Sequence, residues 1–297
     1  MDIRNKITVK QKAFTLVEIL AVIAVIGLLS SIIFAITRGA DEQGRIAKGL
    51  YFSQHLHNSL GSYAAGIWSF DEGAGSTAND ISGWDNNGTL VNTPTWRCAS
   101  TDSSYTPSGQ GCSLEFNGVN NYVLIGKPAS LNDLEQFTYE AWVYWKGFGS
   151  YAWPRVFNKN YKFFNIRNDE RIEATVYSDI SPYARSISSG TMPQNTWTHL
   201  VMIYDNYGDR KTHIFMNGTE MNYSQQGTNT GVLYSDASYN LTISDGNSIN
   251  ATIDEARIYA TSLTAVQIQS QYYAGLERLL DKEYITEQEY QQRLVKS

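Results

Sequence analysis

The chain has 297 residues, of which 42% are hydrophobic, 13% aromatic and 18% charged. This composition excludes a disordered, collagen-like or heptad-repeat chain and allows one large or two ordinary domains. A formal net charge of -6 and a pI near 5.3, with no cluster of Lys and Arg in the body of the chain, argue against a nucleic-acid partner.

A basic N-terminal stretch and a long apolar run open the chain. The run covers residues 14–36, and Arg4, Lys6, Lys10 and Lys12 precede it. A helix rising about 1.5 Å per residue over this range is roughly 34 Å long, enough to cross a bilayer core of about 30 Å. The run therefore predicts a transmembrane helix. The preceding basic residues place its N-terminus in the cytoplasm, so the chain is exported after about residue 37.

One carboxylate interrupts the apolar run. Glu18 lies near its start, where a charged side chain in hydrocarbon costs a few kcal/mol and by default has a functional partner. The alternative is a tolerated glutamate near the membrane edge that reaches the lipid headgroups.

The segment KAFTLVE at residues 12–18 resembles the prepilin signature of type IV pilins and the related pseudopilins. The resemblance implies that a prepilin peptidase cleaves between Ala13 and Phe14, that Phe14 is then methylated, and that Glu18 pairs with the N-terminal amine of a neighbouring subunit. Gly27 stands where the family's helices often carry a helix breaker. The sequence departs from the family in having Ala13 where glycine is usual. We expect a leader over 1–13 and a transmembrane and assembly helix over 14–60.

After residue 64 the chain changes to short alternating runs rich in Tyr, Trp, Ile and Val, separated by turn residues. This pattern is typical of a β-sandwich or jelly roll. Asn217-Gly218, between two such runs, predicts a two-residue hairpin because both residue types tolerate positive φ. The predicted strands are at 114–126, 137–145, 197–205, 212–223 and 248–260.

Segments such as GIWSFDEGAG at 66–75, LEFNG at 114–118 and IDEARIY at 253–259 resemble the laminin-G-like branch of the concanavalin A-like lectin/glucanase fold. The resemblance covers residues 64–270 and implies two stacked antiparallel sheets, a calcium ion at one edge, and binding of glycans or proteins. Calcium takes oxygen ligands, and the ligand candidates are Asp80, Asn117 and Asp254. The alternative is that these side chains only cap turns.

Enzymatic activity is not expected. Glucanases of this fold resemble one another in an ExDxxE strand that aims two carboxylates at one bond, and this spacing does not occur here. The adjacent pairs Asp71-Glu72 and Asp254-Glu255 would point to opposite faces of a strand. Tryptophans in strand patterns, Trp68, Trp142 and Trp197, are expected in the core. A sugar-stacking surface would use the aromatic residues predicted in loops, Trp84, Trp96, Tyr151, Trp153 and Tyr183.

The two cysteines and the C-terminal tail complete the chain. Cys98 and Cys112 predict one disulfide, because an exported domain is exposed to an oxidising compartment. Apolar residues at helical spacing predict a helical tail over 271–297, with a capping box from Thr286 to Glu289. The tail resembles a SHOCT-type oligomerisation motif, and the alternative is a helix that docks on the sandwich or on the membrane-proximal helix.

The predicted fold is therefore mainly β: a long N-terminal pilin-type helix, a concanavalin A-like jelly-roll sandwich and a short C-terminal helical tail. We expect a filament subunit that displays an extracellular recognition domain for adhesion or glycan binding. Its partners would be other pilin subunits, the prepilin peptidase, the inner membrane and a glycan or surface protein. The precursor would lie in the cytoplasmic membrane and the mature form in a filament or at the cell surface. The alternatives are a membrane-anchored lectin that does not polymerise and a purely structural pilin head.

Overall fold

The computed structural model describes residues 60–102, 106–107, 111–246, 248–281 and 285–296. The predicted leader and assembly helix, with Ala13, Phe14, Glu18 and Gly27, lie outside these residues. Within them, no helix has both the length and the apolar character needed to span a bilayer.

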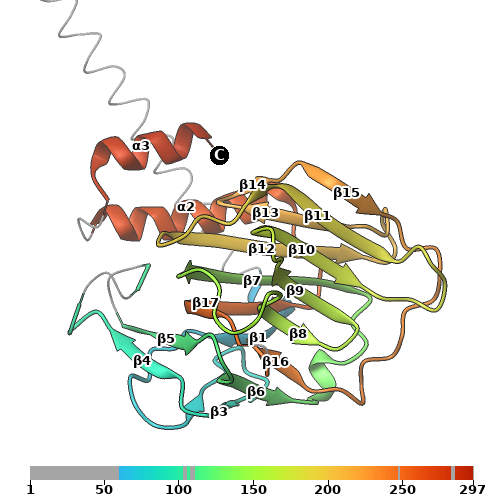
Figure 1. Cartoon of the computed structure of the whole chain (residues 1–297), viewed down its shortest axis with the longest axis horizontal. Helices are drawn as coiled ribbons and strands as arrows, with labels where there is room; N and C mark the ends of the chain where they lie inside the picture. Colours follow the sequence, from blue (N-terminus) through green and yellow to red (C-terminus); the bar gives the residue numbers. More distant parts are fainter. Residues whose placement is uncertain (1–59, 103–105, 108–110, 247, 282–284, 297) are drawn as a thin grey trace, which may run out of the picture. The chain divides into compact units, whose positions relative to one another are not determined.

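The described residues form two antiparallel β-sheets stacked as a jelly-roll-like sandwich (Figure 1). The eight-stranded sheet has the order β14-β13-β12-β7-β17-β5-β4, with β1 paired to β17. The nine-stranded sheet has the order β15-β11-β10-β9-β8-β16-β6-β3-β2. The strands of the first sheet are β1 (Ala64–Trp68), β4 (Thr95–Cys98), β5 (Cys112–Asn117), β7 (Gln136–Trp145), β12 (Trp197–Asp205), β13 (Thr212–Met216), β14 (Thr219–Glu220) and β17 (Asn250–Tyr259). Those of the second are β2 (Thr77–Ala78), β3 (Gly88–Val91), β6 (Tyr122–Gly126), β8 (Arg155–Lys159), β9 (Lys162–Ile166), β10 (Arg171–Val176), β11 (Ala184–Thr191), β15 (Tyr223–Gly227) and β16 (Leu241–Ile243).

Alternation along the long strands builds the core between the sheets. In β12, Leu200 and Met202 join the main core cluster, whereas Val201 and Ile203 belong to a second cluster. Successive strand residues face opposite sides, so the second cluster lies on the outer face of the eight-stranded sheet. The predicted β-sandwich is confirmed.

The predicted hairpin at Asn217-Gly218 is also confirmed. Asn217 has φ 53° and Gly218 has φ 78°, both in the left-handed region, and the two residues join β13 to β14. A Cβ at Gly218 would lie 2.9 Å from Cδ1 of Tyr272, so the position requires glycine for space as well as for conformation.

Two helices follow the sandwich, α2 (Ala265–Asp281) and α3 (Glu287–Lys296). The first begins six residues before the predicted start of the tail at 271. Ile268 is fully buried in the second cluster, and the ring of Tyr272 stacks on that of Trp142 at 5.9 Å, so α2 packs on the outer face of the eight-stranded sheet. The predicted cap of α3 is present, because the backbone N–H of Glu289 donates to Oγ1 of Thr286 at 3.1 Å.

Candidate functional site

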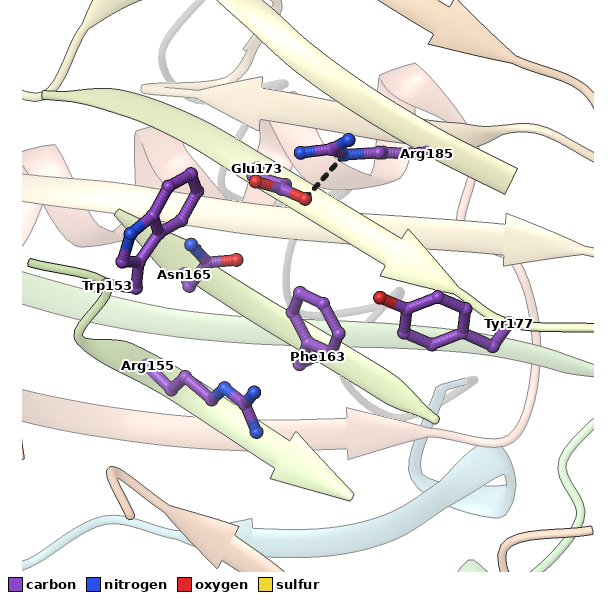
Figure 2. A pocket seen from close by; sticks show the side chains of 7 residues that line it. All are labelled: Trp153, Arg155, Phe163, Asn165, Glu173, Tyr177 and Arg185. Atoms are coloured by element: carbon purple, nitrogen blue, oxygen red, sulfur yellow. Dashed lines mark hydrogen bonds and ion pairs between the residues drawn. The ribbon is translucent and has the colours of Figure 1, made fainter. Parts of the chain in front are cut away.

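A pocket of about 220 Å³ opens on the outer face of β8 to β11 in the nine-stranded sheet (Figure 2). Its position follows from strand alternation. Phe164 and Ile166 of β9 point into the core, so Phe163 and Asn165 point outward. The seven lining residues are Trp153, Arg155, Phe163, Asn165, Glu173, Tyr177 and Arg185. The volume is below the roughly 300–1,000 Å³ of drug-sized ligand sites, so the pocket has room only for a small group.

A buried carboxylate organises one side of the pocket. Glu173 in β10 is 3% exposed, and its two oxygens accept from Nε of Arg185 at 2.7 Å and from Nη1 of Arg167 at 3.0 Å. The hydrogen bond to Glu173 raises the pKa of the Arg185 guanidinium. These charge-assisted contacts hold the two arginines in place without burying an unpaired charge.

An unused amide lies beside this carboxylate. Asn165 pairs with Glu173 across β9 and β10, and it is only 2% exposed. Its Oδ1 is buried and has no hydrogen-bond partner among the described residues. Buried polar atoms are normally paired, so this oxygen is an unsatisfied acceptor on a residue that lines the pocket.

Aromatic rings form the walls of the pocket. Trp153 is 41% exposed, and the guanidinium carbon of Arg167 lies 4.5 Å from its ring centroid. The guanidinium carbon of Arg155 lies 4.6 Å from the centroid of Phe163. These cation–π contacts hold the arginine planes beside the aromatic surfaces, and Nη1 of Arg155 also donates to Oδ1 of Asn158 at 2.6 Å.

The aromatic surface continues beyond the pocket. The ring of Phe163 lies 5.8 Å from that of Tyr177, which lies 4.3 Å from that of Tyr183. The backbone N–H of Tyr177 donates to the carbonyl of Tyr161 at 2.9 Å, which brings a second group beside the first. In that group Tyr161 stacks on Tyr234 at 4.7 Å and meets Tyr239 at 5.2 Å. We call the six residues Tyr161, Phe163, Tyr177, Tyr183, Tyr234 and Tyr239 the aromatic strip.

Some of the aromatic residues singled out from the sequence are buried, and others line the pocket or belong to the aromatic strip. Trp68, Trp142 and Trp197 are buried, as predicted. Of the five predicted loop aromatics, Trp153 lines the pocket and Tyr183 belongs to the aromatic strip. The prediction for Trp96 is wrong, because this residue lies in β4 and its Nε1 donates to the carbonyl of Gly75 at 3.1 Å. The sequence analysis did not identify Glu173, Asn165 and Arg185 as site residues. The alternation along β9 to β11 was the one sequence signal that could have indicated them.

The three predicted calcium ligands have other partners. Both oxygens of Asp80 accept from the chain, Oδ1 from the backbone N–H of Ile67 at 2.8 Å and Oδ2 from that of Asn86 at 2.9 Å. Oδ1 of Asn117 accepts from the N–H of Val119 at 2.9 Å. Oδ1 of Asp254 accepts from the backbone N–H of Glu255 at 2.8 Å. Burial raises the pKa of Asp254 well above its ordinary value, and the charge of Glu255 acts in the same direction.

Two of these three side chains, Asn117 and Asp254, lie too far apart to share one calcium ion. Asn117 in β5 pairs with Asn250 in β17. Asp254 lies four residues further along β17, so Asn117 and Asp254 are about 13 Å apart along the strand. Across the described ranges, no group of three or more His, Cys, Asp or Glu side chains is arranged to hold a metal ion. A bound calcium ion stays a prediction.

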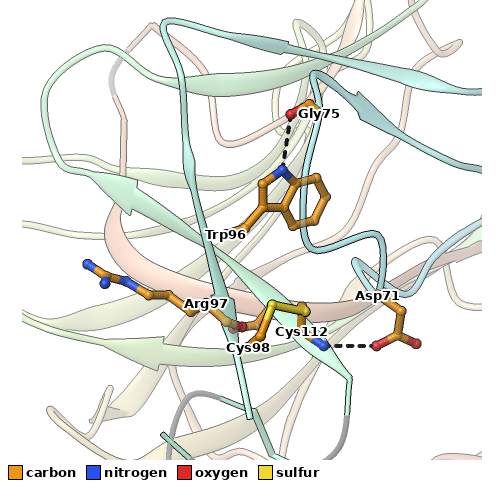
Figure 3. The surroundings of a disulfide bond; sticks show 7 residues. Asp71, Gly75, Trp96, Arg97, Cys98 and Cys112 are labelled. Carbon is orange, nitrogen blue, oxygen red and sulfur yellow. Dashed lines mark hydrogen bonds between the residues drawn. A yellow bond between two sulfur atoms is a disulfide. The ribbon is translucent and has the colours of Figure 1, made fainter. Parts of the chain in front are cut away.

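The predicted disulfide joins Cys98 and Cys112, which face each other across β4 and β5 with Cα atoms 3.9 Å apart (Figure 3). Oδ1 of Asp71 accepts from the backbone N–H of Cys112 at 3.1 Å and fastens the turn after β1 to the bridge. The disulfide therefore anchors the edge of the eight-stranded sheet.

Two families match the sequence. The prokaryotic N-terminal methylation motif matches residues 9–34, which confirms the prepilin signal. The concanavalin A-like lectin/glucanases superfamily matches residues 117–269, more than half of the chain. The chain belongs to the concanavalin A-like lectin/glucanase superfamily. No curated protein matches it.

Solved structures share the lectin-like fold at low sequence identity. The binding domain of Paraclostridial Mosquitocidal Protein 1 has a TM-score of 0.57 and 14% identity, over 73% of this chain and 53% of that one. Trypanosoma rangeli sialidase with sialic acid has a TM-score of 0.51 and 12% identity, over 76% of this chain and 38% of that one. Domain 4 of the Geobacillus stearothermophilus arabinanase AbnA, in complex with arabinotriose, has a TM-score of 0.51 and 18% identity, over 69% of this chain and 96% of that one. The chain thus spans about half the length of the first structure and about two-fifths of the second.

Proposed function

We propose that this lectin-like chain is a type IV pilin-like subunit whose head binds a glycan without hydrolysing it. The observation that carries the glycan assignment is the pocket in the nine-stranded sheet, where aromatic faces stand beside an unused buried amide and two arginines. Sugars present C–H faces that stack on aromatic rings and hydroxyl groups that need several hydrogen-bond partners. The lectin-like fold and the arabinotriose bound to the arabinanase domain support this assignment.

In this site one sugar ring would stack on Trp153. Its hydroxyl groups would donate to Oδ1 of Asn165 and accept from the guanidinium groups of Arg155 and Arg185. Glu173 would act as the positioning residue that orients Arg185 and Arg167. The aromatic strip would carry further sugar units of the same chain, because rings accept stacking without a demanding hydrogen-bond geometry.

A glycan array probed with the head, residues 60–297, tests this proposal. The array should include arabino-oligosaccharides and sialylated glycans, and Trp153→Ala should lower retention of the bound glycan by at least tenfold. Tyr207→Ala is the matched control, since Tyr207 is 76% exposed in the turn after β12 and does not line the pocket. Equal loss in both variants, or no retained glycan at all, would favour the purely structural head.

The filament assignment has a separate test. The methylation motif at residues 9–34 supports processing before Phe14 and assembly through Glu18. Sequencing the mature N-terminus should find N-methylphenylalanine at Phe14, and Glu18→Ala should abolish incorporation into filaments while leaving the head folded. An intact Met1 would favour the membrane-anchored lectin that does not polymerise.

A further inference from the structure

A cluster of buried charges lies where β8 turns into β9, outside the pocket described above. Lys159 ends β8, Lys162 begins β9, and Asp236 belongs to the connection between β15 and β16. Their side chains are 1%, 2% and 0% exposed. The backbone N–H of Asp133 donates to Oδ1 of Asp236 at 2.9 Å, and the N–H of Asp236 donates back to Oδ1 of Asp133 at 2.9 Å. These two hydrogen bonds fix the connection between β15 and β16 against the connection between β6 and β7, which contains Asp133.

Two ammonium groups share one buried carboxylate in this cluster. Nζ of Lys162 lies 2.7 Å from Oδ2 of Asp236, and Nζ of Lys159 lies 3.5 Å from Oδ1. Asp133 is exposed, so solvent screens its charge. A buried charge is costly unless it is fully paired, and Lys159 has the longer and weaker of the two contacts.

Lys159 also faces a primary amide. Its Nζ lies 2.6 Å from Oδ1 of Asn132, so the carbonyl carbon Cγ is one C=O bond of about 1.2 Å further along. Lys162, in contrast, donates to the backbone carbonyl of Leu134 at 2.9 Å. Burial lowers the pKa of Lys159, and the charge of Lys162 acts in the same direction against the opposing charge of Asp236. A desolvated lysine beside a second cation is an activated amine nucleophile.

We propose that Lys159 and Asn132 join in an intramolecular isopeptide bond, with Asp236 as the general base. Lys159 enters as the neutral amine, after its third proton has gone to solvent. Nζ attacks Cγ of Asn132, and the carbonyl π electrons move to Oδ1. Asp236 takes one proton from Nζ and returns it to Nδ2 of Asn132. The carbonyl re-forms, the Cγ–Nδ2 bond breaks with its electron pair on nitrogen, and ammonia leaves.

Formation of the isopeptide bond removes the excess positive charge from the buried cluster. One buried ammonium becomes a neutral amide, and Lys162 and Asp236 remain as a one-to-one pair. Asn132 is half-buried, so ammonia has a path to solvent. The bond covalently ties the segment after the short helix η3 (Ala129–Leu131) to the end of β8. It depends on neither glycan binding nor filament assembly.

Peptide mapping by tandem mass spectrometry of the full-length chain tests the proposal. After incubation of the purified protein at neutral pH, a protease digest should contain a branched peptide that joins Asn132 to Lys159, lighter than its two parts by one ammonia. Lys159→Met and Asn132→Ala should each remove the branched peptide. Asp236→Asn should leave both segments linear, with near-ultraviolet circular dichroism reporting whether that variant folds. Lys146→Met is the matched control, because Lys146 pairs with Glu115 at 2.9 Å in another part of the sandwich, and it should retain the branch.

Three results would overturn the proposal. The first is that the incubated wild-type chain yields only linear peptides from both segments. The second is a branch from Asn132 to Lys162, which would assign the wrong nucleophile. The third is loss of ammonia at Asn132 without a branch, since that product is a cyclic imide with the following Asp133.

Discussion

Replacement of Glu140 by glutamine should strongly destabilise the head, because this residue is the centre of a buried polar network between the eight-stranded sheet and α2. Glu140 is 1% exposed, and its Oε1 lies 3.0 Å from Nε2 of His199 and accepts from Nη1 of Arg257 at 3.0 Å. Nη1 of Arg257 also donates to Oε1 of Gln271 in α2 at 3.0 Å. The network thus joins the helix to three strands of the sheet.

The magnitude follows from what the substitution leaves behind. Glu140→Gln keeps the shape of the side chain but removes the negative charge beside a buried guanidinium. Breaking a buried ion pair by removing one partner costs about 3–5 kcal/mol. Gln still offers an oxygen acceptor, and Arg257 keeps its contact with Glu255 at 2.5 Å, so we expect the lower end, about 3 kcal/mol.

The pH dependence gives the sharper assay. Burial alone would raise the pKa of Glu140, but the hydrogen bond from His199 and the charge of Arg257 hold it below the ordinary 4.5. A lowered folded pKa means that the ionised group stabilises the fold above the unfolded pKa and loses this effect as pH falls through the folded pKa. Urea unfolding should therefore show the full difference between wild type and Glu140→Gln at pH 7, and a narrowing difference as pH falls below about 4.5.

Glu115→Gln is the matched control. Glu115 pairs with Lys146 and Arg97 at a partly exposed site, so its loss should cost less than about 1 kcal/mol. A Glu140→Gln effect no larger than that of the control, or a difference that stays constant from pH 7 to pH 3, would refute the reasoning.

The remaining predictions concern the disulfide, the packing of α2 and calcium. Replacing Cys98 and Cys112 by serine opens a loop of sequence separation 14 and should cost about 3 kcal/mol in urea unfolding; an unchanged midpoint would contradict this. Gly275→Ala should cost about 1–3 kcal/mol in thermal unfolding, because its Cβ would lie 2.3 Å from Cζ2 of Trp142, and no loss would mean that α2 shifts freely. If calcium binds the native head, chelator should lower Tm, whereas an unchanged Tm would reject the metal.

The sequence predicts the long strands and the hairpin of the sandwich because these elements depend on local sequence patterns. The long strands β7 and β12 alternate over many residues, and Asn217-Gly218 has the residue types that the hairpin conformation requires. Short or irregular elements escape this reasoning. Trp96 lies in a strand of only four residues, and Glu255 has φ 50° where the pairing of β17 with β7 shifts register. The alternation expected for Asp254 and Glu255 therefore breaks down at that bulge.

The pocket could not be predicted because it depends on strand order. Arg155 faces Asn165, which faces Glu173, only because β8, β9 and β10 are neighbours in the sheet. Each residue alone reads as an ordinary polar position on a strand. Trp153 and Tyr183 were accessible to sequence reasoning because aromatic residues in turn-rich segments stand out without any knowledge of pairing.

The C-terminal tail decides which face of the sandwich is available to a ligand. Sequence left two interpretations of the tail open, oligomerisation and docking, and the structure supports docking for α2. Tyr272 is 1% exposed and packs on Trp142 and His199, and Gly275 approaches Trp142 closely. This helix covers Trp142 of β7 and His199 of β12, both of which are buried, and so removes them from any ligand. The outer face of β8 to β11 keeps its aromatic strip exposed at Tyr234 and Tyr239, and this asymmetry directs the proposed glycan to the nine-stranded sheet.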